Sequence, residues 1–181
     1  MGMQEAGGSG SGLPGNGFIL GVDTSLRSTG LGLIETRGSR LTLVEQAVVR
    51  HPAAWPLSRC LASLYGAVAD MLARRRPGAA ALEGVFFCKN VRTAVVLGEA
   101  RGAVIAACAR AAVPVFEHSP RRVKQAVSGS GAAGKGQVGR MVAAMLGLAS
   151  APPEDAADAL AIAICHAHAG RYATLSDARG I

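Results

Sequence analysis

The fold is decided by residues 18–34, FILGVDTSLRSTGLGLI, in which two short apolar runs flank a polar turn. Residues 18–22 and 31–34 have the composition of strands, and the turn between them ends in Gly30. Two apolar runs joined by a short polar segment predict a β-hairpin. Residues 41–49 alternate weakly between apolar and polar side chains, which predicts a third strand on the same sheet.

Strands and helices alternate along the rest of the chain. Apolar residues spaced by three and four predict helices over 57–76, 90–112, 120–127, 137–148 and 154–168, and apolar runs predict strands over 79–85 and 113–117. Small apolar residues on both faces of the strand at 79–85 indicate burial beside a parallel first strand. This order predicts an α/β fold, a mixed five-stranded sheet flanked by helices on both faces.

Length and composition predict a single folded domain over residues 18–169. The chain has 181 residues, half of them hydrophobic, which is enough for one well-filled core. Residues 1–17 are rich in Gly and Ser and predict a disordered extension rather than a signal peptide. Residues 170–181 form a C-terminal tail without a firm pattern, and residues 128–136, SGSGAAGKG, predict a mobile loop.

The charge balance favours a polyanionic partner. Lys and Arg number 19 against 12 Asp and Glu, which gives a net charge of +7 and an isoelectric point near 9.9. Nucleic acid is preferred to membrane because no stretch is apolar long enough to span a bilayer. A basic surface without a partner is the alternative. The four cysteines lie far apart, which is typical of a reduced, cytoplasmic protein.

Four carboxylates stand at the ends of apolar elements. Asp23 and Glu83 each end an apolar run, and Asp155 and Asp158 lie three apart, on one face of the last helix. A buried, unpaired carboxylate costs roughly several kcal/mol, so a compensating charge is expected. Carboxylate ligands suit Mg²⁺ or Mn²⁺ rather than zinc, and a two-metal phosphodiester site is the simplest chemistry. The alternative for the helical pair is an acidic first turn favoured by the helix dipole.

Several ordered motifs resemble one known family. They are Gly21-Val22-Asp23 with Ser28-Thr29-Gly30, residues 82–86 with Lys89-Asn90, residues 97–102, Val123-Lys124-Gln125 and residues 155–163. On these motifs, which span roughly residues 18–168, the chain resembles the RuvC family of Holliday-junction resolvases, whose fold is ribonuclease-H-like.

The resemblance implies a Mg²⁺-dependent endodeoxyribonuclease acting in recombination and repair. Asp23, Glu83, Asp155 and Asp158 match the family's catalytic acids, which hold two Mg²⁺ ions, with Mn²⁺ as a substitute. The family cuts two opposed strands of a four-way DNA junction as a homodimer. The resemblance also implies the branch-migration proteins RuvA and RuvB as partners.

Basic residues near the glycine-rich segment are candidates for catalysis and DNA binding. By resemblance, Lys124 and Lys135 match lysines near the scissile phosphate, where a cation offsets transition-state charge. Arg121 and Arg122 extend the basic strip as phosphate contacts. The alternative for both lysines is a solvated surface position. His118 is a weaker candidate for proton transfer, since a hydrogen-bonded structural role is favoured.

The segment after Glu83 supplies further DNA-binding candidates. By resemblance, Phe86 is the wedge that stacks on bases at the crossover, and Lys89 and Asn90 belong to the same motif. Burial in the core is the alternative for Phe86, and a helix cap is a further role for Asn90. Gly84 departs from the larger polar residue expected after the catalytic Glu.

Two other functions are compatible with parts of the sequence. Asp23-Thr24-Ser25 followed by Gly30 resembles the phosphate-binding hairpin of actin and sugar-kinase phosphotransferases, which need a second lobe. A non-catalytic junction-binding module would fit the basic surface equally well. The four acids argue against the binding module, because clustered negative charge gains nothing in DNA binding.

Overall fold

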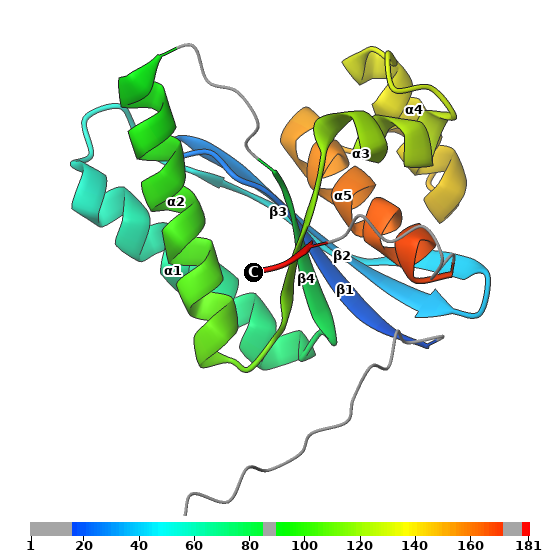
Figure 1. Ribbon diagram of the computed structural model, residues 1–181, viewed down its shortest axis with the longest axis horizontal. Helices are drawn as coiled ribbons and strands as arrows, with labels where there is room; N and C mark the ends of the chain where they lie inside the picture. Colours follow the sequence, from blue (N-terminus) through cyan, green and yellow to red (C-terminus); the bar gives the residue numbers. More distant parts are fainter. Residues whose placement is uncertain (1–15, 85–89, 172–178) are drawn as a thin grey trace, which may run out of the picture.

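The computed structural model describes residues 16–84, 90–171 and 179–181. A twisted sheet separates two helical layers, with α1 (Leu57–Arg75) and α2 (Val91–Arg110) on one face and α3 (Pro120–Ser128), α4 (Lys135–Leu146) and α5 (Glu154–Arg171) on the other (Figure 1). The predicted α/β architecture with helices on both faces is confirmed. No helix of the described part of the chain is long and apolar enough to cross a membrane.

The sheet has the strand order β3-β2-β1-β4-β5-β6. These strands are β1 (Asn16–Asp23), β2 (Ser28–Arg37), β3 (Arg40–Arg50), β4 (Ala79–Glu83), β5 (Val115–His118) and β6 (Arg179–Gly180). The first three pair antiparallel, whereas β4 runs parallel to β1 and β5 parallel to β4. All five predicted strands are present, and β4 lies beside β1 as its composition indicated.

The C-terminal tail contributes an element that the sequence did not indicate. Within it, β6 pairs antiparallel with β5 through Phe116 and Glu117. A strand of two residues is too short to show the alternation by which strands are recognised.

The glycine-rich segment is more ordered than predicted, and the predicted loop over 128–136 is wrong at both ends. Ser128 is the last residue of α3, where its hydroxyl donates to the Lys124 carbonyl oxygen at 2.8 Å. Gly129 ends that helix in the left-handed conformation, with φ +73°, and α4 begins at Lys135. Terminal turns of helices tolerate small residues because fewer of their backbone groups need intrahelical partners.

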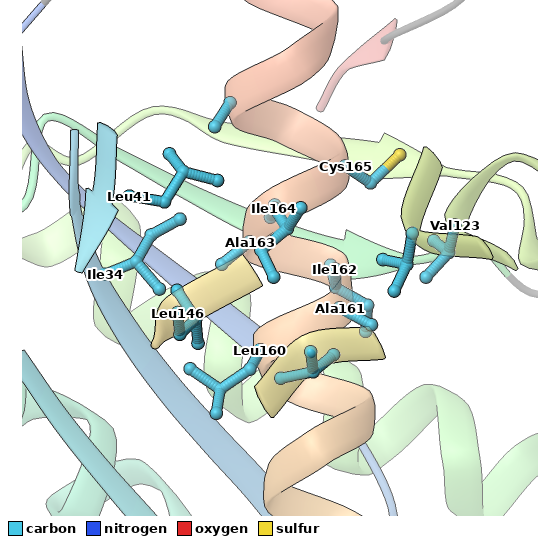
Figure 2. Close-up of a cluster of buried hydrophobic side chains, with 14 of the residues drawn as sticks. Ile34, Leu41, Val123, Leu146, Leu160, Ala161, Ile162, Ala163, Ile164 and Cys165 are labelled. Carbon is cyan, nitrogen blue, oxygen red and sulfur yellow. The ribbon is translucent and has the colours of Figure 1, made fainter. Parts of the chain in front are cut away.

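Each sheet face has its own hydrophobic core because successive side chains of a strand point to opposite faces. On β1, Ile19 joins the core beneath α5, whereas Leu20 and Val22 join the core beneath α1 and α2. On β4, Ala81 faces α5, whereas Leu82 faces α1 and α2. Figure 2 shows the first core, in which α5 from Leu160 to Cys165 is surrounded by apolar side chains.

Candidate functional site

Strand alternation brings the two sheet acids onto the same face. Asp23 follows Ile19 by four residues on β1, and Glu83 follows Ala81 by two residues on β4, so both acids belong to the α5 face. The parallel register aligns Val22 with Leu82, which puts Asp23 and Glu83 next to each other at the end of their strands. Both strands end there, so the two acids lie at one edge of the sheet.

Glycines on β1 and β2 allow the backbone of α5 to rest directly on this face. A Cβ atom added to Gly30 would lie 1.8 Å from the Asp155 carbonyl oxygen, and one added to Gly21 would lie 2.0 Å from the Ala159 carbonyl oxygen. Gly30 is the β2 partner of Asp23. The contact therefore places the first turn of α5, which carries Asp155 and Asp158, beside the sheet acids.

The Asp155 carboxylate has contacts of its own at this edge. The Ser28 hydroxyl donates to Asp155 Oδ2 at 2.5 Å, and Arg50 approaches the same oxygen at 3.9 Å. Asp23, Glu83 and Asp158 also have interactions. Among the residues that the structure describes, no group of three or more His, Cys, Asp or Glu side chains is arranged to hold a metal ion. The backbone thus gathers the four acids, while their side chains do not form a closed ligand set.

The chemistry of the donors nevertheless fits a hard divalent cation. All four candidate ligands are carboxylates, the ligand type that Mg²⁺ and Mn²⁺ prefer, and Asp155 remains about one-third exposed, with 32 % of its side chain accessible. Such a cation would compete with Arg50 and Ser28 for Asp155.

Basic residues begin at the same edge. β5 ends at His118, the partner of Glu83, and α3 starts two residues later. Arg121 is exposed and Lys124 is half-buried. The Arg122 side chain forms a hydrogen bond with the buried Cys165. Arg122 is therefore shared between the surface and the interior, a placement that the sequence did not indicate.

The other predicted site residues are only partly visible. Asn90 caps α2, where its side chain accepts from the Thr93 amide at 3.1 Å, as predicted. Lys135 opens α4. Phe86 and Lys89 lie outside the described residues. The roles of all four in catalysis or DNA binding stay predictions.

His118 forms a buried pair beneath the acids. Its Nε2 lies 3.1 Å from His166 Nδ1, and the His166 ring also packs on Phe116. Burial lowers the pKa of His166 from 6.5 to about 4, and burial together with the neighbouring His166 and the Arg122 charge lowers the pKa of His118 from 6.5 to about 4. Two neutral rings sharing a hydrogen bond agree with the structural role favoured for His118.

Two contacts of the acids come from residues that were not selected as site residues. Ser28 binds Asp155, and Arg101 on α2 donates to the Glu83 carbonyl oxygen and to the Glu117 carboxylate. Arg101 could have been noticed as the single charge within Ala100-Arg101-Gly102-Ala103-Val104. Ser28 offers no such signal, because its partner is 127 residues away.

This fold, with acids at a sheet edge and basic residues on the adjoining helix, defines a nuclease of the ribonuclease-H-like class. A family model described as "Crossover junction endodeoxyribonuclease RuvC" matches residues 19–166. The chain belongs to the RuvC family, as its motifs predicted.

Individual relatives agree over most of their length. The RuvC of Pelotomaculum thermopropionicum is 48% identical over 152 residues, covering 83% of this chain and 93% of that protein. The RuvC of Rubrobacter xylanophilus is 45% identical over 164 residues, covering 90% of each. The solved structure of Thermus thermophilus RuvC in complex with a Holliday junction substrate superimposes with a TM-score of 0.84 at 37% identity, covering 91% of this chain and 99% of that one. The predictions of a ribonuclease-H-like fold and of an endonuclease are confirmed.

Proposed function

We propose that this protein resolves four-way DNA junctions by paired, Mg²⁺-dependent hydrolysis of two opposed strands. One observation carries the proposal. Asp23 and Glu83 end neighbouring strands on the face that α5 covers, and Gly30 seats the Asp155 end of α5 against them. Four carboxylates at one edge of a basic protein suit the hydrolysis of a phosphodiester.

The chain's own residues divide the work of the reaction. Asp23, Glu83, Asp155 and Asp158 would hold two divalent ions, which supply an activated water and stabilise the leaving oxygen when bound. Ser28 orients the Asp155 carboxylate through their hydrogen bond. Lys124 and Lys135 offset the charge that develops on the phosphate. Arg121 and Arg122 contact phosphates away from the reacting bond.

The remaining parts of the proposal concern recognition of the junction. Phe86 stacks on a base at the crossover, and Lys89 and Asn90 contact the DNA beside it. RuvA and RuvB are the proposed branch-migration partners. A reducing, cytoplasmic location is supported by the buried free thiols of Cys60, Cys108 and Cys165.

A homodimer is part of the same proposal, because two opposed cuts need two active sites. Val91 and Val95 are the supporting residues, with exposed fractions of 80% and 54% on the first turns of α2. They lie four residues apart, so they form one apolar strip on the helix. An isologous contact between two such strips would place two active sites in one particle.

Cleavage of a labelled synthetic junction tests the proposal. The purified protein is incubated with a four-way junction or a linear duplex of the same sequence, first with Mg²⁺ and then with EDTA. Symmetric nicks on the junction alone, abolished by EDTA, are the expected result, because the acids need a cation to act on a phosphodiester. Tight junction binding without cutting would favour the binding module, and ATP turnover without cutting would favour the phosphotransferase.

Replacing Asp23 by Asn tests the metal site itself. The amide keeps the volume of the carboxylate and removes its charge, so cutting is expected to fall below detection while junction binding is equal or tighter. Asp70→Asn, at an exposed position of α1, is the matched control and should cut like the original protein. Normal cutting by Asp23→Asn would remove Asp23 from the site.

A further inference from the structure

Arg101 is a buried arginine without a role in the functions assigned so far. Its side chain is 11% exposed, and the residues that follow it along α2, Gly102, Ala103 and Val104, are small or apolar. The guanidinium donates through one nitrogen to the Glu83 carbonyl oxygen and through another to the Glu117 carboxylate. Burying a guanidinium costs several kcal/mol, roughly, unless it is paired, so both contacts are needed to keep it there.

The contact with Glu83 is to its backbone rather than to its carboxylate. The carbonyl group of Glu83 and the amide of Gly84 belong to one planar peptide group. Arg101 donates to the carbonyl oxygen of this group, and the Gly84 N–H of the same group donates to the His118 carbonyl oxygen at 2.9 Å. The peptide group that follows Glu83 is therefore held at both of its polar atoms.

This peptide group anchors the end of β4, from which the Glu83 side chain projects. The pairing of β1 with β4 ends at Leu82, whereas β5 pairs with Glu83 itself, so the contacts with β5 and Arg101 hold the end of β4 beyond Leu82. The Cα of Glu83 is bonded to this peptide group, so holding the group in place limits the movement of the strand end that carries the Glu83 side chain. Glu117 faces α2 and Glu83 faces α5, so Arg101 reaches the strand end from the side opposite the acids.

We infer that Arg101 is a positioning residue for Glu83, fixing the peptide group after it so that the carboxylate meets the other acids. The inference rests on the proposed metal site. Arg101 acts through the Glu83 backbone, and Glu117 in turn holds Arg101. Partners of this kind, one step from the ligands, orient ligands and raise metal affinity.

Arg101→Met tests the inference, because methionine is also unbranched but has no guanidinium and so removes both hydrogen bonds. Mn²⁺ binding to the DNA-free protein is measured by titration calorimetry, and junction cutting is measured across a Mg²⁺ series. The expected result is metal affinity weaker by about tenfold, and a lower maximal cutting rate with unchanged junction affinity in EDTA. Arg110→Met, at an exposed position in the last turn of α2, is the control and should leave all three quantities unchanged.

A milder pair of variants covers the case in which Arg101→Met does not fold. Glu117→Gln keeps an acceptor for Arg101 but removes its charge, and Arg101→Lys keeps the charge but cannot bind both partners. Both should show faster hydrogen exchange at the Gly84 amide and a raised Mn²⁺ requirement, with melting temperatures close to that of the original protein.

The outcomes separate this inference from the function on which it depends. Absence of junction cutting by the original protein would count against the proposed function. If the original protein cuts, and folded Arg101 variants bind Mn²⁺ and cut as it does, the positioning role is overturned. Weaker junction binding in EDTA together with normal Mn²⁺ affinity would also overturn it, since that pattern belongs to a DNA contact.

Discussion

Three glycines determine how closely α5 approaches the sheet. Gly21, Gly30 and Gly32 lie on the α5 face of β1 and β2, and an added Cβ at each would come within 3 Å of helix atoms. No side chain fits at these positions, so the distance between the helical acids and the strand acids depends on backbone contact. Residues that carry no chemistry thereby control the residues that do.

Gly30→Ala should disable the enzyme without touching a carboxylate. Its new methyl group would lie 1.8 Å from the Asp155 carbonyl oxygen, so the start of α5 must move away from Asp23. Cutting is expected to fall at least about 100-fold, and stability by about 1–3 kcal/mol, as in other overpacked cores. Cleavage assays and urea unfolding measure the two effects.

Gly66→Ala is the matched control, because a Cβ at this position in α1 would meet no atom within 4 Å beyond its chain neighbours and the backbone of its own helix. It should cut normally and gain up to about 1 kcal/mol in stability from helix propensity. A Gly30→Ala protein with normal cutting would show that the close contact is dispensable.

The acids were predictable from the sequence, whereas their supports were not. Asp23 and Glu83 stand out because each ends an apolar run, a signal contained in neighbouring residues. The Ser28–Asp155 hydrogen bond joins residues 127 positions apart, and Arg101 binds Glu83 across 18 positions. Such contacts depend on how elements pack, and no local pattern contains that information.

At the scale of elements, β5 and α5 are joined by the pair of buried histidines. His118 and His166 have exposed fractions of 1% and 4%, and His118 Nδ1 has no hydrogen-bond partner among the described residues. Protonating either ring would bury a charge between the strand and the helix that carry the site. The pair therefore makes the attachment of α5 sensitive to acid.

Stability should fall as the pH drops from 6.5 towards 4. In the unfolded chain both histidines have a pKa near 6.5, whereas in the folded protein burial lowers both pKa values to about 4. Between these two pKa values the unfolded state binds more protons than the folded state. The free energy of unfolding therefore decreases as the pH is lowered, by up to about 1.4 kcal/mol per pH unit for each histidine. Urea unfolding at several pH values measures this slope.

His166→Gln removes one of the two titrating groups and should reduce the slope in this pH range by about half, if the two sites contribute equally. The same substitution at His168, on the same helix but outside the pair, is the control. An equal slope in the original protein and His166→Gln would contradict the account.

The boundaries of α3 and α4 mark where composition misled the sequence prediction. Gly and Ser dominate residues 128–136, and no apolar period extends into them, so the helical turns at Ser128 and Lys135 were not anticipated. Helix ends need only local capping and a favourable backbone. Long amphipathic helices such as α1, in contrast, were recognised almost to the residue because their buried side chains repeat over several turns.

At the scale of the whole molecule, the apolar strip of Val91 and Val95 on α2 predicts a dimer. Val91→Glu combined with Val95→Glu should convert a dimer into monomers, because the charges would face each other across an isologous contact. Sedimentation velocity measures the change, and junctions should then receive single nicks instead of paired ones. Met141→Glu, at an exposed apolar position on α4, is the control and should stay dimeric. A monomeric original protein would remove the strip from the proposed interface.

The seating of α5 on glycines also bears on how such an enzyme tolerates change. The distance from the strand acids, Asp23 and Glu83, to the helical acids of α5 is set by direct contact between the backbones of the sheet and the helix. Exchanges among Leu, Ile and Val in either core do not alter that contact. A chain redesigned throughout its two cores, for heat resistance or expression, would keep the geometry of its acids provided that Gly21, Gly30 and Gly32 stayed unchanged. The distance between the strand acids and the helical acids is thereby independent of substitutions in the hydrophobic residues around them.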